Sequence, residues 1–346
     1  MAGNNSVWGL LNDLSSKQGI TEIIINSPDR IFVEREGGFI QLDVRVSRKD
    51  IFEFIEEVAK FNKRTIDKGK PILDGSLPDG SRVNVVLVPF ARGCPAVTIR
   101  KYLKNIQRFD TSNGVFGLDS FWVTFLKAIV HARMNIIVSG GTGVGKTTFL
   151  NMLLAEVHDT ERIITIEDTI ELDIPHDNSV RLEVINNFSE GETLTARDMV
   201  KNTLRMRPDR IVVGEVRGEE IFDLLQAMNV GHEGSMTSIH SSSPSECISR
   251  METLYLLSGY DVPNRVVRKH VSDAVDFIIQ LGRTRQGRRI VTHISELTGM
   301  EGDTIQMSGI AVFKGDHLTK TGMTPSKMRT LHQRAGLPIE FFAGNA

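Results

Sequence analysis

Hydrophobic and polar positions alternate with the period of a β-strand through most of the first hundred residues. This alternation predicts strands over residues 20–26, 30–36, 39–44, 82–88 and 96–100, with a hairpin turn at residues 37–38. Between them, apolar residues at 51, 54, 55, 58 and 61 have helical spacing and follow a capping-box pair, Ser47 and Asp50. Together with a short helix over residues 7–14, the pattern predicts a small α+β domain over residues 1–105.

The pattern changes after a stretch without strong periodicity, residues 106–118, which is predicted to be an interdomain linker. Short apolar runs at 135–139, 162–166, 210–214 and 235–239 then alternate with stretches of helix length. Such alternation predicts an α/β domain over residues 119–346, with a mainly parallel sheet and crossover helices. Near the end, residues 275–281 and 289–297 are predicted to pair as antiparallel strands.

The composition limits the classes of function. Apolar residues make up 40% of the 346 residues and charged residues 24%, and the formal net charge is −2. This balance is typical of a soluble globular protein and argues against a dedicated nucleic-acid binder, which carries a basic excess. Cys94 and Cys247 have no metal-ligand spacing, and no secretory signal or bilayer-spanning stretch is present, so we expect a cytoplasmic protein.

The first apolar run of the parallel sheet leads into the octapeptide GGTGVGKT at residues 140–147, which matches the phosphate-loop pattern G-x-x-x-x-G-K-[ST]. The glycines let backbone N–H groups turn toward a polyphosphate where a Cβ would obstruct them. Lys146 is expected to reach the β- and γ-phosphates of ATP, and Thr147 to hold Mg²⁺. The helix that follows adds its positive N-terminus to the site. The predicted nucleotide-contacting residues are Gly140, Gly141, Thr142, Gly143, Val144, Gly145, Lys146, Thr147 and Thr148.

The next three predicted strands all end in an acid or a histidine, at the edge where parallel sheets bind ligands. These residues are Glu167 with Asp168, then Glu215, then His240. One acid after one strand would be weak evidence, because polar residues often end strands at the surface. Three strand ends at one edge favour a catalytic site, in which Glu215 orients or deprotonates the water that attacks the γ-phosphate.

The candidate Mg²⁺ ligands and the candidate functional histidine His240 belong to the same edge of the predicted sheet. Because Gly214 stands where many phosphate-loop proteins carry an aspartate, the Mg²⁺ shell is predicted to use Thr147, water, Glu167 and Asp168. His240 is a candidate to donate a hydrogen bond to the γ-phosphate, and His232 a further candidate nucleotide contact. The alternative for each histidine is an ordinary structural role.

Together these segments resemble the secretion ATPase superfamily of type II secretion, type IV secretion and type IV pili. The four blocks of that superfamily correspond to residues 140–147, 162–171 (RIITIEDTIE), 210–218 (RIVVGEVRG) and 231–240 (GHEGSMTSIH). The segments SPDRIFVERE, LPDGSRVNVV, PAVTIRK and ELTGMEGD further resemble the CpaF/TadA group, which powers Flp-type (tight adherence) pilus assembly. Fewer than 20 residues precede the first predicted strand, where many members of that group carry a helical extension.

The resemblance implies a hexameric ring of this chain with a RecA-like core, peripheral to the inner membrane and working with membrane platform proteins. It also implies that the N-terminal domain covers the nucleotide cleft. Arg82 and Arg100 match the arginines that such domains present to the phosphates, and Arg217 is expected to contact the nucleotide or brace the loop after Glu215. The alternative for both N-terminal arginines is a surface salt bridge.

Three other functions remain open from the sequence. A type IV secretion (conjugation) ATPase belongs to the same superfamily and fits the short segment before the first strand. A RecA-type nucleic-acid translocase would share the core, but the 6% aromatic content and the negative charge count against it. A nucleotide switch without hydrolysis is disfavoured by Glu215.

Overall fold

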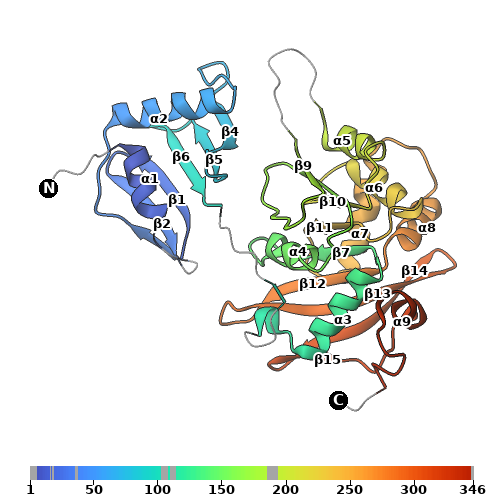
Figure 1. The fold of residues 1–346 in the computed structure, drawn as a ribbon. Coiled ribbons are helices and arrows are strands. Elements are labelled where there is room, and N and C mark those ends of the chain that lie inside the picture. The colour runs from blue at the N-terminus through green and yellow to red at the C-terminus, as the bar shows by residue number, and fades with distance from the viewer. Residues whose placement is uncertain are drawn as a thin grey trace. The chain divides into compact units, whose positions relative to one another are not determined.

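The computed structural model describes residues 6–15, 17, 19–35, 38–102, 108–109, 114–184 and 194–343. It divides into two compact units, whose described parts lie within residues 6–102 and within residues 108–184 and 194–343 (Figure 1). Each unit has its own hydrophobic core.

The first unit contains an antiparallel sheet in the order β3-β2-β1-β6-β5-β4. Its strands are β1 (Ile20–Ser27), β2 (Arg30–Arg35), β3 (Gly38–Gln41), β4 (Ile72–Ser76), β5 (Arg82–Val86) and β6 (Ala96–Arg100). Val83 and Val85 of β5 are buried while Arg82 and Asn84 are not, because successive side chains point to opposite faces. One face of this sheet therefore builds the core and the other carries polar side chains.

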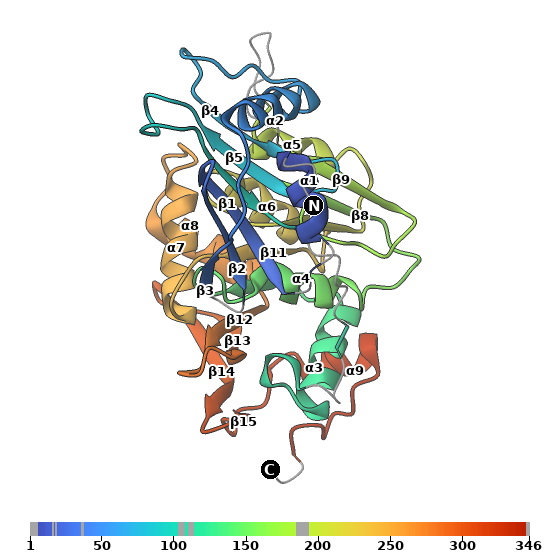
Figure 2. The same cartoon turned by 90° about the vertical axis from the view of Figure 1, so that its left-hand side faces the viewer.

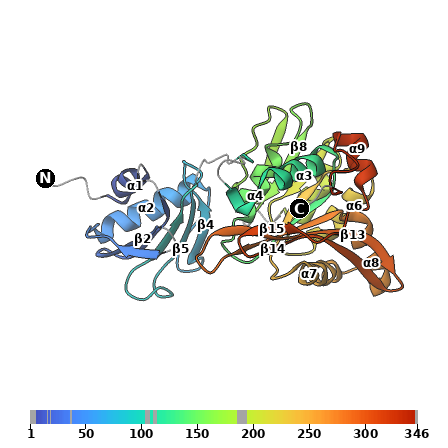
Figure 3. The same cartoon turned by 90° about the horizontal axis from the view of Figure 1, so that it is seen from below.

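Two helices, α1 (Val7–Ser15) and α2 (Arg48–Phe61), cover the apolar face of this sheet (Figure 3). The predicted capping box begins α2: the Asp50 amide donates to the Ser47 hydroxyl and the Ser47 amide to the Asp50 carboxylate, both at 3.0 Å. Trp8 of α1 packs edge-on against Phe54 of α2 at 4.9 Å between ring centroids. These contacts join the two helices over the sheet.

The second unit contains a nine-stranded sheet in the order β15-β14-β13-β12-β7-β11-β10-β8-β9. From β12 to β9 neighbouring strands are parallel, and from β12 to β15 they are antiparallel. The strands are β7 (Ile136–Ser139), β8 (Ile163–Glu167), β9 (Ser179–Glu183), β10 (Arg210–Val213), β11 (Met236–Ile239), β12 (Phe277–Arg283), β13 (Arg289–Glu301), β14 (Thr304–Lys314) and β15 (His317–Lys320).

Helices cover both faces of this sheet, which is why β7, β8, β10 and β11 are buried throughout rather than alternating between buried and exposed positions. Ile136 and Val138 of β7 belong to one core cluster and Ile137 to the other. The first cluster lies under α3 (Ser120–His131), α4 (Lys146–Leu154) and α9 (Met328–Ala335). The second lies under α5 (Ala196–Thr203), α6 (Glu220–Asn229), α7 (Pro244–Leu256) and α8 (Asn264–Ala274). Figure 3 shows α3 and α4 on one side and α7 and α8 on the other, and Figure 2 shows α3 beside α9.

The α/β class with a mainly parallel sheet is confirmed, but several details differ from prediction. The strand predicted over 39–44 ends at Gln41, and β4, β9, β14 and β15 were not predicted. Gly75 interrupts the apolar pattern of β4, and β9 is only half-buried, so neither has a clear strand signal. Gly37 of the predicted turn and residues 106–107 and 110–113 of the predicted linker lie outside the described residues.

Phe116 and Leu118, which the predicted linker includes, are buried in the core of the second unit, next to the short 3₁₀ helix η2 (Val115–Gly117). Cys94 and Cys247 are buried free thiols. Among the helices that the structure describes, none has the length and apolarity needed to cross a membrane.

Candidate nucleotide-binding site

The GGTGVGKT segment connects β7 to α4, with a strand before it and a helix after it. Gly143 and Gly145 have φ angles of +71° and +96°, in the left-handed region that favours glycine. A Cβ at Gly140 would lie 2.7 Å from the Val144 side chain and 3.1 Å from the Leu281 carbonyl oxygen. Sterics thus explain glycine at three positions of this loop. Thr142 is exposed, Val144 is buried, and Thr148 lies in the first turn of α4.

Lys146, the first residue of α4, is buried and folds back over the loop. Its ammonium group donates hydrogen bonds to the carbonyl oxygens of Gly140 and Gly141, at 3.0 and 3.1 Å. The same nitrogen lies 3.1 Å from Nδ1 of His240. The lysine charge is therefore held inside the loop, where a bound phosphate would compete with these acceptors.

The ends of β11 and β10 bring His240 and Glu215 together beside the loop, because these strands follow β7 in the sheet. His240 Nε2 lies 2.6 Å from Glu215 Oε1, and the Arg217 guanidinium donates to Glu215 Oε2 at 2.5 Å. Arg217 also donates to Asp168 Oδ2 at 3.0 Å. Burial and the nearby charge of Lys146 lower the pKa of His240, so this imidazole is neutral at pH 7. A continuous polar chain thus connects the phosphate loop to Asp168.

Glu167 ends β8, the next strand, and its side chain is buried. Its Oε1 accepts hydrogen bonds from the amides of Glu171 and Leu172, at 2.9 and 2.8 Å. Its Oε2 is buried without a hydrogen-bond partner, and desolvation raises the pKa of this carboxyl to about 7. A Cβ at position 214 would lie 3.0 Å from Glu167 Cγ, so glycine there leaves room for this side chain.

The residues around Thr147 fit a Mg²⁺ ion that shares its shell with phosphates. The Thr147 hydroxyl donates a hydrogen bond to Glu171 Oε2 at 3.3 Å. Glu167 Oε2, which has no hydrogen-bond partner, is a further oxygen that could bind the metal ion. No group of three or more His, Cys, Asp or Glu side chains in the described residues forms a metal cage. Mg²⁺ commonly uses one or two protein carboxylates and takes its other ligands from phosphates and water. Asp168, predicted as a ligand, is instead paired with Arg217.

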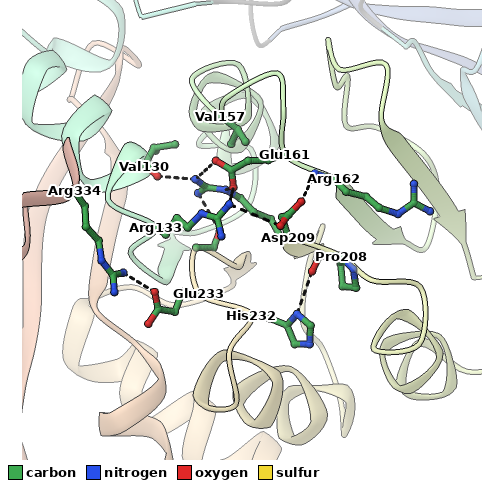
Figure 4. Close-up of polar contacts among 12 residues, drawn as sticks. Val130, Arg133, Val157, Glu161, Arg162, Pro208, Asp209, His232, Glu233 and Arg334 are labelled. Atoms are coloured by element: carbon green, nitrogen blue, oxygen red, sulfur yellow. Dashed lines mark hydrogen bonds and ion pairs between the residues drawn. The ribbon is translucent and has the colours of Figure 1, made fainter.

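His232 is not brought to this edge of the sheet. It lies between α6 and β11, at the amino end of the strand whose carboxyl end carries His240, and its Nδ1 is 3.3 Å from the Pro208 carbonyl oxygen. Figure 4 shows its ring at the Pro208 carbonyl. Because the two ends of a strand lie at opposite edges, the prediction of a nucleotide contact for His232 has no support within one chain.

Arg82 and Arg100 belong to the first unit, where they lie directly opposite each other on β5 and β6. Arg82 forms an ion pair with Asp74 at 2.8 Å, and Arg100 is exposed. Their role at the phosphates stays a prediction.

Three further residues touch the loop and were missed from the sequence. The Arg283 guanidinium donates to the Gly143 carbonyl oxygen at 2.6 Å. Phe116 and Arg289 both approach Gly145, where a Cβ would lie 3.0 and 3.2 Å from their side chains. The sequence feature that could have indicated these contacts is the cluster of four arginines between residues 283 and 289.

A parallel sheet covered by helices on both faces, with a phosphate loop and catalytic candidates at one edge, defines a RecA-like P-loop nucleotide-binding core. The chain belongs to the family of type II/IV secretion system proteins, whose model matches residues 8–309. The putative conjugal transfer protein Rv3659c of Mycobacterium tuberculosis is 33% identical over 316 residues, covering 89% of this chain and 88% of that protein. The conjugal transfer protein TrbB of Rhizobium radiobacter is 32% identical over 281 residues, covering 80% and 84%.

Among solved structures, that of the pilus retraction motor PilT with bound ADP has a TM-score of 0.62 and 21% identity, and it covers 83% of this chain and 81% of PilT. At this identity the likeness concerns the fold. The relatives named for conjugal transfer support the conjugation alternative better than the Flp-pilus interpretation, and the specific resemblance to the CpaF/TadA group is not shown.

Proposed function

We propose that this chain is an ATP-hydrolysing motor of a type IV secretion or conjugation machine. The observation that carries the proposal is the meeting of the phosphate loop, Lys146, His240 and Glu215 at one edge of the sheet. The similarity to conjugal transfer proteins supports this choice of machine. As in the superfamily it resembles, we expect a homo-hexamer, cytoplasmic and peripheral to the inner membrane, that acts on membrane platform proteins.

The first step of the proposed mechanism is binding of the phosphates. Lys146 exchanges the carbonyl oxygens of Gly140 and Gly141 for the β- and γ-phosphate oxygens, which offer a full charge rather than a dipole. The backbone amides at the start of α4 add further donors. Mg²⁺, held by Thr147 and by carboxylate oxygens of Glu171 and Glu167, would neutralise charge on the same phosphates.

The second step is activation of water by Glu215. Glu215 Oε2 accepts a hydrogen bond from Arg217, whereas Oε1 is buried without a hydrogen-bond partner, 2.6 Å from His240 Nε2. When a phosphate takes Lys146 away from the Gly140 and Gly141 carbonyls and from His240, the His240 imidazole becomes available to the γ-phosphate. The Glu215 carboxylate oxygen then accepts the proton of the attacking water. His240 thus links nucleotide binding in the loop to the activity of Glu215 as the general base.

Two variants test hydrolysis at this site. Lys146→Ala should abolish tight ATP binding and turnover, because it removes the cation of the loop. Arg285→Ala, an exposed arginine in the same unit, serves as the control for loss of one positive charge. Phosphate release and calorimetric ADP binding measure the two properties. Normal turnover by Lys146→Ala would contradict the site assignment.

The machine is tested in the source organism with the gene deleted. Loss of DNA transfer to a recipient, with surface pili retained, is the expected result. Loss of pili with normal DNA transfer would instead support a motor for Flp-type pilus assembly. ATPase activity of the purified chain that rises with added single-stranded DNA would support the nucleic-acid translocase.

A further inference from the structure

The hairpin formed by β12 and β13 flanks the phosphate loop on the side away from Glu215. β12 pairs in parallel with β7, so its carboxyl end lies beside the loop that leaves β7. The chain turns over residues 284–288 and returns as β13. Arg283 and Arg289 are directly opposite each other in this hairpin, so their side chains share one face.

Both arginines reach the phosphate loop. The Arg283 guanidinium donates to the Gly143 carbonyl oxygen at 2.6 Å, and Arg289 Cδ lies 3.2 Å from the position of a Cβ on Gly145. Both side chains are exposed. Both guanidinium groups therefore lie at the loop that is expected to hold the phosphates.

An aromatic ring completes this flank of the loop. Phe116 lies 3.0 Å from the same Cβ position of Gly145 and packs edge-on against Phe149 at 5.1 Å between centroids. Its backbone has φ +55°, an outlier for a bulky residue, and Arg288 of the hairpin donates to the Gly114 carbonyl oxygen at 3.0 Å. The hairpin thus holds the segment before α3 against the loop, and the strain is of the kind found at ligand sites.

The two flanks of the loop offer different chemistry to a nucleotide. On the β11 side, Lys146, His240 and Glu215 suit the β- and γ-phosphates and the attacking water. On the β12 side, the structure has cations with flat guanidinium groups and no catalytic acid among the described loop contacts. A guanidinium both pairs with phosphate oxygens and stacks on a planar ring. This side therefore suits the remaining parts of a nucleotide.

We infer that Arg283 and Arg289 form the nucleoside end of the nucleotide site, with the Arg283 guanidinium on the α-phosphate and the Arg289 guanidinium on the face of the base. The inference rests on the proposed function, because it needs a nucleotide in the loop. When the nucleotide binds, the Arg283 guanidinium exchanges the Gly143 carbonyl for the ligand. Phe116 packs against the loop at Gly145 and does not contact the ligand.

The test compares ADP with pyrophosphate, which fills the phosphate loop but has no nucleoside. Arg289→Ala should weaken ADP binding about tenfold, the effect of one charge-assisted contact, and weaken pyrophosphate binding much less, whereas Arg283→Ala should weaken both, because pyrophosphate also supplies the phosphate that Arg283 contacts. Arg285→Ala, from the turn of the same hairpin, should change neither affinity. Calorimetry on the full chain gives both constants, and pyrophosphate binding shows that each variant is folded.

A conservative substitution separates shape from charge. Arg289→Lys keeps the charge but loses the flat group, so it should keep pyrophosphate affinity and still lose affinity for ADP. Equal losses for both ligands in Arg289→Ala, restored together by lysine, would make Arg289 a general cation and overturn the inference. Unchanged ADP affinity would overturn it too. If the unmodified chain binds neither ligand, the proposed function itself fails.

Discussion

Glu167→Gln is expected to make the protein more stable at neutral pH while slowing ATP hydrolysis. Burial leaves Oε2 of this carboxylate without a partner, and desolvation raises its pKa to about 7. Glutamine has nearly the same shape, and its amide oxygen can accept the two backbone hydrogen bonds that Glu167 Oε1 accepts. The substitution therefore removes a buried charge and leaves the local hydrogen bonding intact.

The magnitude follows from the pKa. In the folded protein the carboxyl ionises near pH 7 rather than near its ordinary value of 4.5. Below pH 4.5 the group is protonated in both the folded and unfolded states and has no effect on stability. Between pH 4.5 and 7 the unfolded state releases its proton first, so the free energy of unfolding falls as pH rises. At about 1.4 kcal/mol per pH unit, the loss approaches roughly 3 kcal/mol above pH 7.

The assay is denaturant or thermal unfolding at pH 4.5 and pH 8, with EDTA and without nucleotide, for the unmodified chain and the variant. Glu167→Gln should match the unmodified chain at pH 4.5 and exceed it by roughly 3 kcal/mol at pH 8, about 6–12 °C in the melting midpoint of a unit of this size. Asp168→Asn, the neighbouring acid in an exposed ion pair with Arg217, is the control and should show no gain. A gain that is equal at both pH values, or a variant less stable at pH 8, would refute the reasoning.

Three other outcomes are expected. Glu215→Gln should keep nucleotide affinity but no longer hydrolyse ATP, measured as phosphate release, since an amide cannot accept the proton. Lost affinity with an unchanged rate per bound nucleotide would make Glu215 a structural or Mg²⁺-holding residue. Arg100→Ala should slow turnover by ~10²-fold, less than the ~10³–10⁵ of a fully engaged arginine finger, while rings still form in sizing measurements; loss of the rings would make it an interface residue. Glu161→Ala should lower the free energy of unfolding of the second unit by about 3–5 kcal/mol, measured in urea, because it leaves the fully buried Arg210 without its carboxylate partner. The control is Glu233→Ala, which removes an exposed carboxylate paired with Arg334, and an equally small effect of both variants would contradict a buried pair.

The sequence alone determined the features whose signals are local. The phosphate loop was predicted from eight consecutive residues, because the chemistry of a polyphosphate dictates glycines, a lysine and a threonine at fixed spacing. The capping box of α2 and the apolar strands β7, β8, β10 and β11 were likewise found, since each pattern is contained within a few residues. The edge shared by Glu167, Glu215 and His240 followed from the rule that parallel strands end together.

Which distant segments meet depends on the packing of the whole chain. Arg283 contacts Gly143, 140 positions away, because β12 is the neighbour of β7 in the sheet, and no local pattern specifies that order. His232 lies away from the loop for a different reason: it precedes β11 while His240 follows it, so the two histidines lie at opposite edges of the sheet. Strand neighbours are chosen by the packing of two whole helical layers on the sheet. The physical reason is that periodicity reports which face of an element is buried, not which element will cover it.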